Sequence, residues 1–459
     1  MRIFEIIALI LVTTTIFSSI LDRTNRTFLH LLFTSSLGLM LQHWKEGIRW
    51  QLYPSIYLLL FVYVCYKFWP NRQNHVSYKG IVLVWLLLGW FTPWSVPVFE
   101  MPEPGGEFTV GTQTFYLTDS SRIEWFTPDE TDDFREMVLQ CWYPSKDSKS
   151  QAPEPYMDQM RIRAKPLSNA AGISSFLPTH LEHVKTNSYE NLSCYASNGP
   201  YPTLIFSHGI TGSRHLHQIL FEYLSSRGFI VFAPNHSYDA SISIFPDGRI
   251  ADYRSEITGH PDSVAIRSIQ METRSEDIKY IQNFIVRMNN GDLPSKLKGM
   301  IDLNKLALAG HSFGGATAIC ASSENKMIKA CIALDGWISP IPNTIINSGM
   351  NVPFLFIGRK SWNDSSYPGN YLKLAELINS SSGPCNIKAL DQALHLDFSD
   401  VPMHSPLIRY FVDVGTLKQS ESIQLTNQAV HGFLEENLLK IKNENFRTVM
   451  DNKLFLDIF

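Results

Sequence analysis

The sequence predicts an α/β protein whose mostly parallel sheet is covered by helices on both faces and is preceded by an all-helical region. Three observations lead to this fold class. Apolar segments of strand length alternate with segments of helix length from about residue 137 onward. A Gly-His-Ser-Phe-Gly motif at residues 310–314 stands between one such strand and a helix. Long uncharged stretches fill most of the first hundred residues.

These uncharged stretches cover residues 6–21, 27–44, 51–66 and 80–99, and none of them contains Asp, Glu, Lys or Arg. Each is close to the ~17–25 residues that a helix needs to cross a bilayer. A cleaved signal peptide would also account for the first stretch, but no small-residue cleavage site follows it and further apolar segments come next. We therefore expect residues 1–99 to form a transmembrane helical region of three to four spans.

Net charge separates this region from the rest of the chain. Residues 1–99 carry eight Lys or Arg against three acids, a net charge of +5; because the whole chain carries −4, residues 100–459 carry −9. A basic membrane region suits phospholipid headgroups. The acidic remainder gives no support for nucleic-acid binding.

The distribution of basic residues predicts an orientation in the membrane. With four spans, the loops after the first and third spans hold five basic residues: Arg23, Arg26, Lys67, Arg72 and Lys79. The opposite side holds three: Arg2, Lys45 and Arg49. This difference places the two loops in the cytoplasm and the C-terminal domain on the non-cytoplasmic side, whereas three spans would reverse the assignment.

A Pro- and Gly-rich linker at residues 100–106 predicts that a catalytic domain occupies residues 100–459. The expected strands are residues 137–143, 203–207, 229–233, 306–309, 328–334, 353–357 and 386–390. The expected helices are residues 216–226, 276–288, 371–379 and 426–439. Alternation at this spacing is typical of a parallel sheet with helices packed on both of its faces.

Ser312 is the predicted nucleophile. The apolar run of residues 306–309 precedes its motif and the helix-forming run of residues 316–321 follows, which is the context of a nucleophile elbow. The turn needs glycine at 310 and 314, because a Cβ there would collide with the neighbouring strand or helix. The sequence therefore predicts the α/β-hydrolase fold.

A serine nucleophile needs a histidine base and an acid that holds the histidine in the correct tautomer, and in this fold the chain order is Ser, acid, His. Asp335 ends the apolar run of residues 332–334 and is the predicted acid, although an aspartate at a strand end can also be a turn former or helix cap. His395 follows the last expected strand and is the predicted base. His404, in a Pro-flanked loop, and His431, in the last helix, remain as alternatives.

The oxyanion of the reaction requires two backbone donors. One is expected to be the N–H of Phe313, the residue after the nucleophile. The other is expected to be the N–H of Ile210, because a Gly-containing loop follows the strand of residues 203–207. The side chains of His208 and His311 are expected to hold these two loops by local hydrogen bonds.

Neither a metal site nor a cofactor is expected, because the sequence contains no Cys-x-x-Cys or His-Glu-x-x-His spacing. Most of the six cysteines fall in or beside apolar elements and are expected to be buried free thiols. Cys194 and Cys385 lie in expected loops, so a disulfide between them stays open. The sequence indicates no oligomeric state.

Three segments together resemble one known family: Phe-Ser-His-Gly at residues 206–209, Gly-His-Ser-Phe-Gly-Gly-Ala-Thr at residues 310–317, and Ile-Ala-Leu-Asp-Gly-Trp at residues 332–337. They are similar to the plasma-type platelet-activating factor acetylhydrolases, also called group VII phospholipases A2, and their bacterial relatives. The resemblance extends over roughly residues 101–440. It implies the same fold, the same triad and oxyanion donors, and calcium-independent hydrolysis of short or oxidised sn-2 acyl chains of phospholipids.

The expected membrane region departs from this family, whose secreted members carry a signal peptide. Apolar residues between 165 and 186 either flank the mouth of the pocket or pack within a loop: Ile173, Phe176, Leu177 and Leu181. The main hypothesis is a membrane-anchored serine esterase that acts on phospholipid or another ester. The alternatives are a general carboxylesterase or acyltransferase on small esters, and a non-catalytic membrane receptor or scaffold built on a hydrolase fold.

Overall fold

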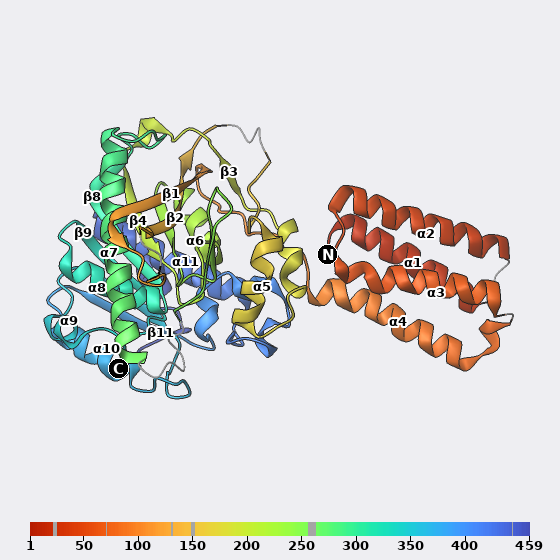
Figure 1. The fold of residues 1–459 in the computed structure, drawn as a ribbon. Helices are drawn as coiled ribbons and strands as arrows, with labels where there is room; N and C mark the ends of the chain where they lie inside the picture. Colours follow the sequence, from red (N-terminus) through yellow and green to blue (C-terminus); the bar gives the residue numbers. More distant parts are fainter. Residues whose placement is uncertain (22–24, 70, 130–131, 148–151, 256–262, 443) are drawn as a thin grey trace.

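The computed structural model describes residues 1–21, 25–69, 71–129, 132–147, 152–255, 263–442 and 444–459. Figure 1 shows two parts: a bundle of four helices at the N-terminus, in red and orange, and a larger α/β part that contains the rest of the chain. The bundle touches the larger part only at one of its ends, beside α5. We call this larger α/β part the hydrolase part.

The bundle contains α1 (Ile3–Ile20), α2 (Asn25–Glu46), α3 (Tyr53–Phe68) and α4 (Val76–Ser95). These helices correspond to the four uncharged stretches. By length and composition alone, α1 and α4 are apolar enough to cross a membrane, whereas α3 has only 16 residues. The number of spans stays a prediction.

A 10-stranded sheet organises the hydrolase part, in the order β12-β11-β10-β9-β8-β4-β5-β2-β1-β3. Its strands are β1 (Thr109–Ile123), β2 (Phe134–Ser145), β3 (Ser188–Glu190), β4 (Tyr201–Ser207), β5 (Ile230–His236), β8 (Ile301–His311), β9 (Ile328–Leu334), β10 (Phe354–Gly358), β11 (Cys385–Leu390) and β12 (Phe455–Leu456). Adjacent strands from β5 to β11 run parallel, whereas β2 and β12 pair antiparallel to their inner neighbours. The predicted mostly parallel sheet is confirmed.

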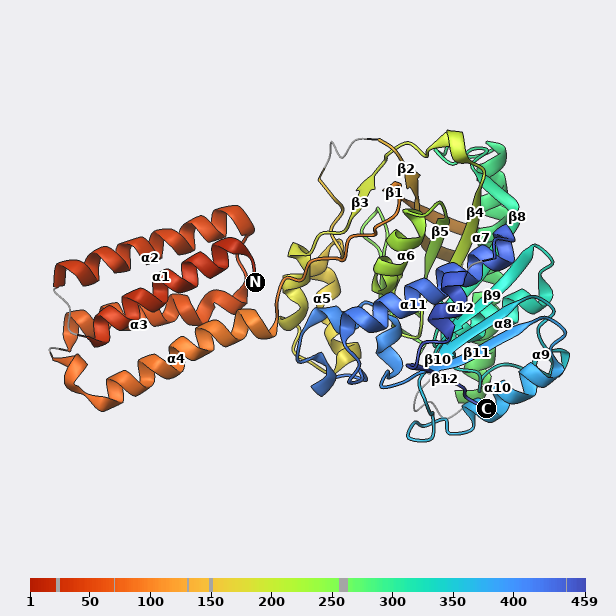
Figure 2. The same cartoon turned by 180° about the vertical axis from the view of Figure 1, so that it is seen from behind.

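Helices cover both faces of this sheet (Figure 2). One face is covered by α7 (Ser263–Asn290), α8 (Phe313–Glu324), α9 (Asn343–Ser348) and α10 (Asn370–Ser380). The other face is covered by α6 (Gln218–Ser225), α11 (Gln419–Leu434) and α12 (Glu444–Met450). Both layers bury aliphatic side chains against the strands, which is the main source of stability in such a fold.

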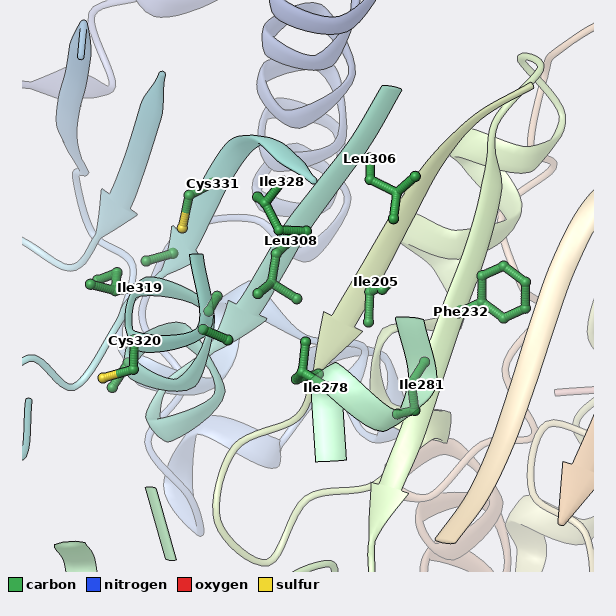
Figure 3. Packing of buried hydrophobic residues seen from close by; sticks show 14 of the residues in the cluster. Ile205, Phe232, Ile278, Ile281, Leu306, Leu308, Ile319, Cys320, Ile328 and Cys331 are labelled. Carbon is green, nitrogen blue, oxygen red and sulfur yellow. The ribbon is translucent and has the colours of Figure 1, made fainter. Parts of the chain in front are cut away.

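Figure 3 shows the core between α7, α8 and the central strands. Its labelled side chains are Ile205, Phe232, Ile278, Ile281, Leu306, Leu308, Ile319, Cys320, Ile328 and Cys331, and all are buried. Alternate residues of each parallel strand face this side, and the intervening residues face α6 and α11. The strands are thus apolar on both faces, as expected for a covered parallel sheet.

Some elements were absent from the sequence prediction. The longest strand, β1, mixes Thr, Gln and Ser with apolar residues and therefore lacks a continuous apolar run; it pairs antiparallel with β2 and lies one strand from the edge of the sheet. The helix α5 (Met160–Ala171) contains Pro166 and also has no strong apolar pattern. All six cysteines are free, so Cys194 and Cys385 form no disulfide.

Hydrogen bonds join the bundle to the hydrolase part. Ser405 Oγ donates to the backbone oxygen of Ser95, at the end of α4 (2.5 Å). His183, in the 3-10 segment η3 (Leu177–His183), bonds the backbone oxygen of Ile48 (3.0 Å). The two parts therefore contact each other directly, beyond their covalent link.

Glu222 on α6 is a buried carboxyl group that ties this helix to the segment before β3. It accepts hydrogen bonds from Ser188 Oγ (2.5 Å) and from the backbone N–H of Asn187 (2.7 Å). Burial raises the pKa of Glu222 from 4.5 to about 7. The folded protein thus binds this proton more tightly than the unfolded chain, and the resulting stability is lost as the pH rises from about 4.5 through about 7.

We expect the Glu222→Gln protein to lose less stability than the wild type between pH 5 and pH 8, because the neutral amide has no proton to lose. Melting temperatures of both proteins at the two pH values test this. Equal losses in the two proteins would show that Glu222 does not titrate in this range.

Candidate active site

Ser312 stands at the tight turn between β8 and α8. Its backbone has φ 57° and ψ −123°, a conformation that is sparsely populated for residues other than glycine and costs on the order of 1–3 kcal/mol. A Cβ on Gly310 would lie 2.1 Å from the backbone oxygen of Gly314, and a Cβ on Gly314 would lie 2.0 Å from that of Ser207. The two glycines are therefore required by close backbone approach, as the sequence predicts for a nucleophile elbow.

Asp335 and His395 contact each other beside this turn. Asp335 directly follows β9 and is fully buried, whereas His395 begins the 3-10 segment η6 (His395–Phe398) after β11. His395 Nδ1 lies 2.5 Å from Asp335 Oδ2, so its N–H donates to the carboxylate. This bond leaves Nε2 as the unprotonated nitrogen of a neutral imidazole.

The two alternative histidines do not reach Asp335. His404 bonds the hydroxyl of Tyr156 through Nε2 (3.2 Å), and burial lowers the pKa of His404 to about 3. His431 lies on α11 and packs its ring against Tyr223 and Phe229. Of the three candidates, the structure brings only His395 to the buried carboxylate.

Two further residues bind Asp335 and were not found by sequence reasoning. The backbone N–H of Arg359 and the indole N–H of Trp362 both donate to Asp335 Oδ1, at 2.9 and 3.1 Å. The Arg359 guanidinium also lies 3.3 Å from Oδ2. Both residues follow β10, so their proximity depends on the pairing of β10 with β9 and no local motif reveals it.

The two predicted oxyanion donors flank Ser312. A Cβ on Gly209 would lie 3.1 Å from Ser312 Cβ, which shows how closely the loop after β4 approaches the elbow. Within the described part of the chain, the N–H groups of Ile210 and Phe313 make no hydrogen bond. Both groups are therefore free to donate to a substrate oxygen.

His208 and His311 hold these loops in place. His208 Nδ1 donates to the backbone oxygen of Gly209 (2.6 Å), and its Nε2 accepts from the backbone N–H of His236 (3.1 Å). His311 Nε2 donates to the backbone oxygen of His395 (2.9 Å). Burial, and the proximity of His395, hold the pKa of His311 well below its usual range, so this imidazole stays neutral.

A cavity of about 570 Å³ opens beside Ser312 and His395. Side chains from α5, η3 and the segment between them form one wall of it, including Leu167, Ala170, Ile173, Leu177 and Leu181. Three of the four apolar residues that the sequence left open, Ile173, Leu177 and Leu181, thus line the cavity. The fourth, Phe176, packs edge-on against Trp50 with ring centroids 5.0 Å apart.

No group of three or more His, Cys, Asp or Glu side chains that could hold a metal ion occurs among the residues that the structure describes. The residues around Ser312 are those of acyl transfer: a serine, a histidine oriented by a buried carboxylate, and two free backbone donors. That the reaction needs no metal stays a prediction.

Known proteins are similar to this chain over about three quarters of its length. Platelet-activating factor acetylhydrolase from Canis lupus familiaris is 26% identical over 75% of this chain and 78% of its own length. A probable 1-alkyl-2-acetylglycerophosphocholine esterase from Arthroderma benhamiae is 23% identical over 75% of this chain and 90% of its own. A solved structure of a ferulic acid esterase from Streptomyces cinnamoneus superposes with a TM-score of 0.62 at 25% identity, covering 76% of this chain and 95% of that one.

The family described as platelet-activating factor acetylhydrolase, isoform II, matches residues 95–453, which include the elbow, Asp335 and His395. The match begins at the last residue of α4 and leaves the helical bundle outside. The α/β-hydrolase fold and the resemblance seen in the sequence are both confirmed. The chain belongs to the platelet-activating factor acetylhydrolase family.

Proposed function

We propose that the protein is a membrane-anchored serine esterase in which Ser312, His395 and Asp335 form the catalytic triad. The hydrogen bond between His395 Nδ1 and the buried Asp335, beside a strained Ser312, is the observation that carries the proposal. A receptor or scaffold built on this fold would not need a fully bonded carboxylate, an oriented imidazole and two free backbone donors at one turn. The family and its relatives support ester hydrolysis as well.

We propose the following reaction for this arrangement. His395 Nε2 accepts the proton of Ser312 Oγ as that oxygen attacks the ester carbonyl, and the carbonyl oxygen becomes an oxyanion that accepts from the N–H groups of Ile210 and Phe313. The carboxylate of Asp335 stabilises the imidazolium that forms. His395 then protonates the leaving alcohol, and water attacks the acyl-enzyme by the same steps in reverse order.

We propose phospholipids with short or oxidised sn-2 acyl chains as substrates, hydrolysed without calcium. The names of the relatives from Canis lupus familiaris and Arthroderma benhamiae support an acetylated glycerophosphocholine as one such ester. The ferulic acid esterase structure supports a general carboxylesterase as the second candidate. An acyltransferase would use the same acyl-enzyme with an alcohol in place of water.

The bundle is proposed to hold the enzyme in a bilayer, with the hydrolase part on the non-cytoplasmic side. Lys67 is in the last turn of α3, Lys79 is in the first turn of α4, and Arg72 lies between these helices. The connection between α3 and α4 is at the end of the bundle away from the hydrolase part (Figure 1); Arg23 lies outside the described residues. At the opposite end, Arg49 pairs with Glu5 (2.7 Å). Protease added to intact cells would trim an exposed hydrolase part and spare a cytoplasmic one.

Replacing the nucleophile gives the first test of the triad. We expect Ser312→Ala to lower kcat by about four to six orders of magnitude while the fold is kept, because no other group can form the acyl-enzyme. An organophosphate should label the wild type on the peptide that contains Ser312. Labelling of a different serine, with Ser312 unmodified, would contradict the assignment.

Trp362→Phe tests the support of Asp335, because it removes one donor and keeps an aromatic ring. We expect kcat to fall by about tenfold, the cost of one hydrogen bond to a buried carboxylate, with little change in KM. Rates on a soluble p-nitrophenyl ester measure both constants. A change in KM alone would place Trp362 in substrate binding instead.

Chelation should leave the rate unchanged, because the serine mechanism forms its nucleophile without a metal. Rates before and after EDTA treatment test this. Complete loss with EDTA and recovery with calcium or zinc would overturn the serine mechanism.

A further inference from the structure

The cavity beside Ser312 is completed by the helical bundle. Its wall includes Trp50 from the 3-10 segment η1 (Trp50–Leu52), Phe91, Thr92 and Ser95 from the last turn of α4, and Val96 just after it. These residues lie outside or at the very edge of the part that matches the family. The bundle thus contributes directly to the space that a substrate of Ser312 would occupy.

The composition of this cavity suits an acyl chain. Most residues of its wall are apolar and come from α5, η3, the bundle, the loop after β4 and residues 396–412, and its volume of about 570 Å³ falls in the ~300–1,000 Å³ range of sites that enclose an organic ligand. Contact between water and such an apolar surface is unfavourable. A flexible hydrocarbon chain fills it and gains about 0.8 kcal/mol for each buried methylene.

Two buried polar groups in the cavity wall lack partners. Within the described residues, the indole Nε1–H of Trp50 donates no hydrogen bond, and neither ring nitrogen of His217 has a partner. His217 is only 3% exposed, and burial lowers its pKa to about 3, so its neutral ring has one N–H to donate. Buried donors are rarely left unsatisfied, and ester or phosphate oxygens of a bound lipid would accept from them.

Exposed aromatic residues gather where the bundle meets the hydrolase part. Phe91 and Trp94, at the end of α4, are 48% and 49% exposed. Phe176 is 52% exposed, and Tyr410 and Phe411, in the 3-10 segment η8 (Ile408–Tyr410) and directly after it, are 75% and 66% exposed. Phe91 and Phe411 also line the cavity. Aromatic side chains at the end of apolar helices mark the level of lipid headgroups.

We propose that the end of the bundle formed by η1 and the last turn of α4 is part of the substrate-binding site, and that the cavity takes a lipid directly from the surrounding bilayer. The acyl chain that Ser312 releases, which includes the oxidised sn-2 chains of the proposed substrates, lies between α5 and that end of the bundle, so the cavity admits chains longer than acetate. The proposal rests on ester hydrolysis at Ser312. In this proposal the bundle has a second function besides anchoring. Its residues in the cavity wall limit the length of the acyl chain that can bind, and so select the substrate.

Chain-length selectivity of the full-length protein tests this proposal. The protein is placed in nanodiscs of an ether-linked phosphatidylcholine, which has no ester to hydrolyse, and kcat/KM is measured for p-nitrophenyl esters from acetate to decanoate. For the wild type, kcat/KM should rise with chain length, by at most about fourfold per methylene, until the cavity is full. In Val96→Trp, the decanoate-to-acetate ratio should fall at least about tenfold, because the indole occupies part of the cavity.

Leu87→Trp is the matched control. Leu87 lies two turns before Ser95 on α4, is 70% exposed and is not part of the cavity wall, so the same substitution there should leave the ratio unchanged. Equal ratios in the wild type, Val96→Trp and Leu87→Trp would overturn the inference. Acetate hydrolysis that still depends on Ser312 would in that case leave the proposed function intact, whereas wild-type hydrolysis of every ester that is unaffected by Ser312→Ala would overturn the proposed function itself.

Trp50→Phe decides the question if Val96→Trp does not fold, because it keeps the ring packed on Phe176 and removes only the N–H. We expect the KM for a fluorogenic phosphatidylcholine embedded in the nanodisc to rise about threefold to tenfold, the effect of one lost hydrogen bond. An unchanged KM would overturn the inference.

Discussion

Close backbone contact at the elbow determines where every other part of the site can stand. Gly314 packs so tightly on the end of β4 that a methyl group there would lie 2.0 Å from the backbone oxygen of Ser207. The loop that follows β4 is therefore held against the turn that follows β8, and Ile210 and Ser312 line the same cavity. The strain in Ser312, on the order of 1–3 kcal/mol, persists because the sheet and α8 hold both of its flanks.

The order of the strands also brings together the proposed acid, Asp335, and the proposed base, His395. Parallel strands place their carboxyl ends at one edge, so the residues that follow β8, β9, β10 and β11 converge there. Asp335 is fully buried, and it stays compatible with the interior because Arg359, Trp362 and His395 donate to it. A buried carboxylate with so many donors fixes the imidazole in one tautomer, which is what a base beside a serine needs.

Much of this arrangement could be predicted from the sequence because it depends on local signals. Ser312 has its glycines, and Asp335 and His395 follow apolar strands in the order that the fold requires. Arg359 and Trp362 escaped prediction because they reach Asp335 only through strand pairing, 24 and 27 residues away along the chain. The Pro- and Gly-rich segment before β1 predicts a domain boundary, but its sequence does not reveal that residues on both sides of it share one cavity.

Because of this shared cavity, the boundary between the two parts in the sequence does not divide the structure into independent parts. A linker at residues 100–106 separates the two parts in sequence, and the family match also begins beside it, at residue 95. In space, however, Trp50 and Val96 face the same cavity as Ser312, and hydrogen bonds from His183 and Ser405 hold the parts together there. A tether alone would need only a flexible linker. Bonds that fix the end of the bundle against η3 are expected where the bundle must keep a defined position relative to the nucleophile, since a wall that moves cannot select a chain by its length.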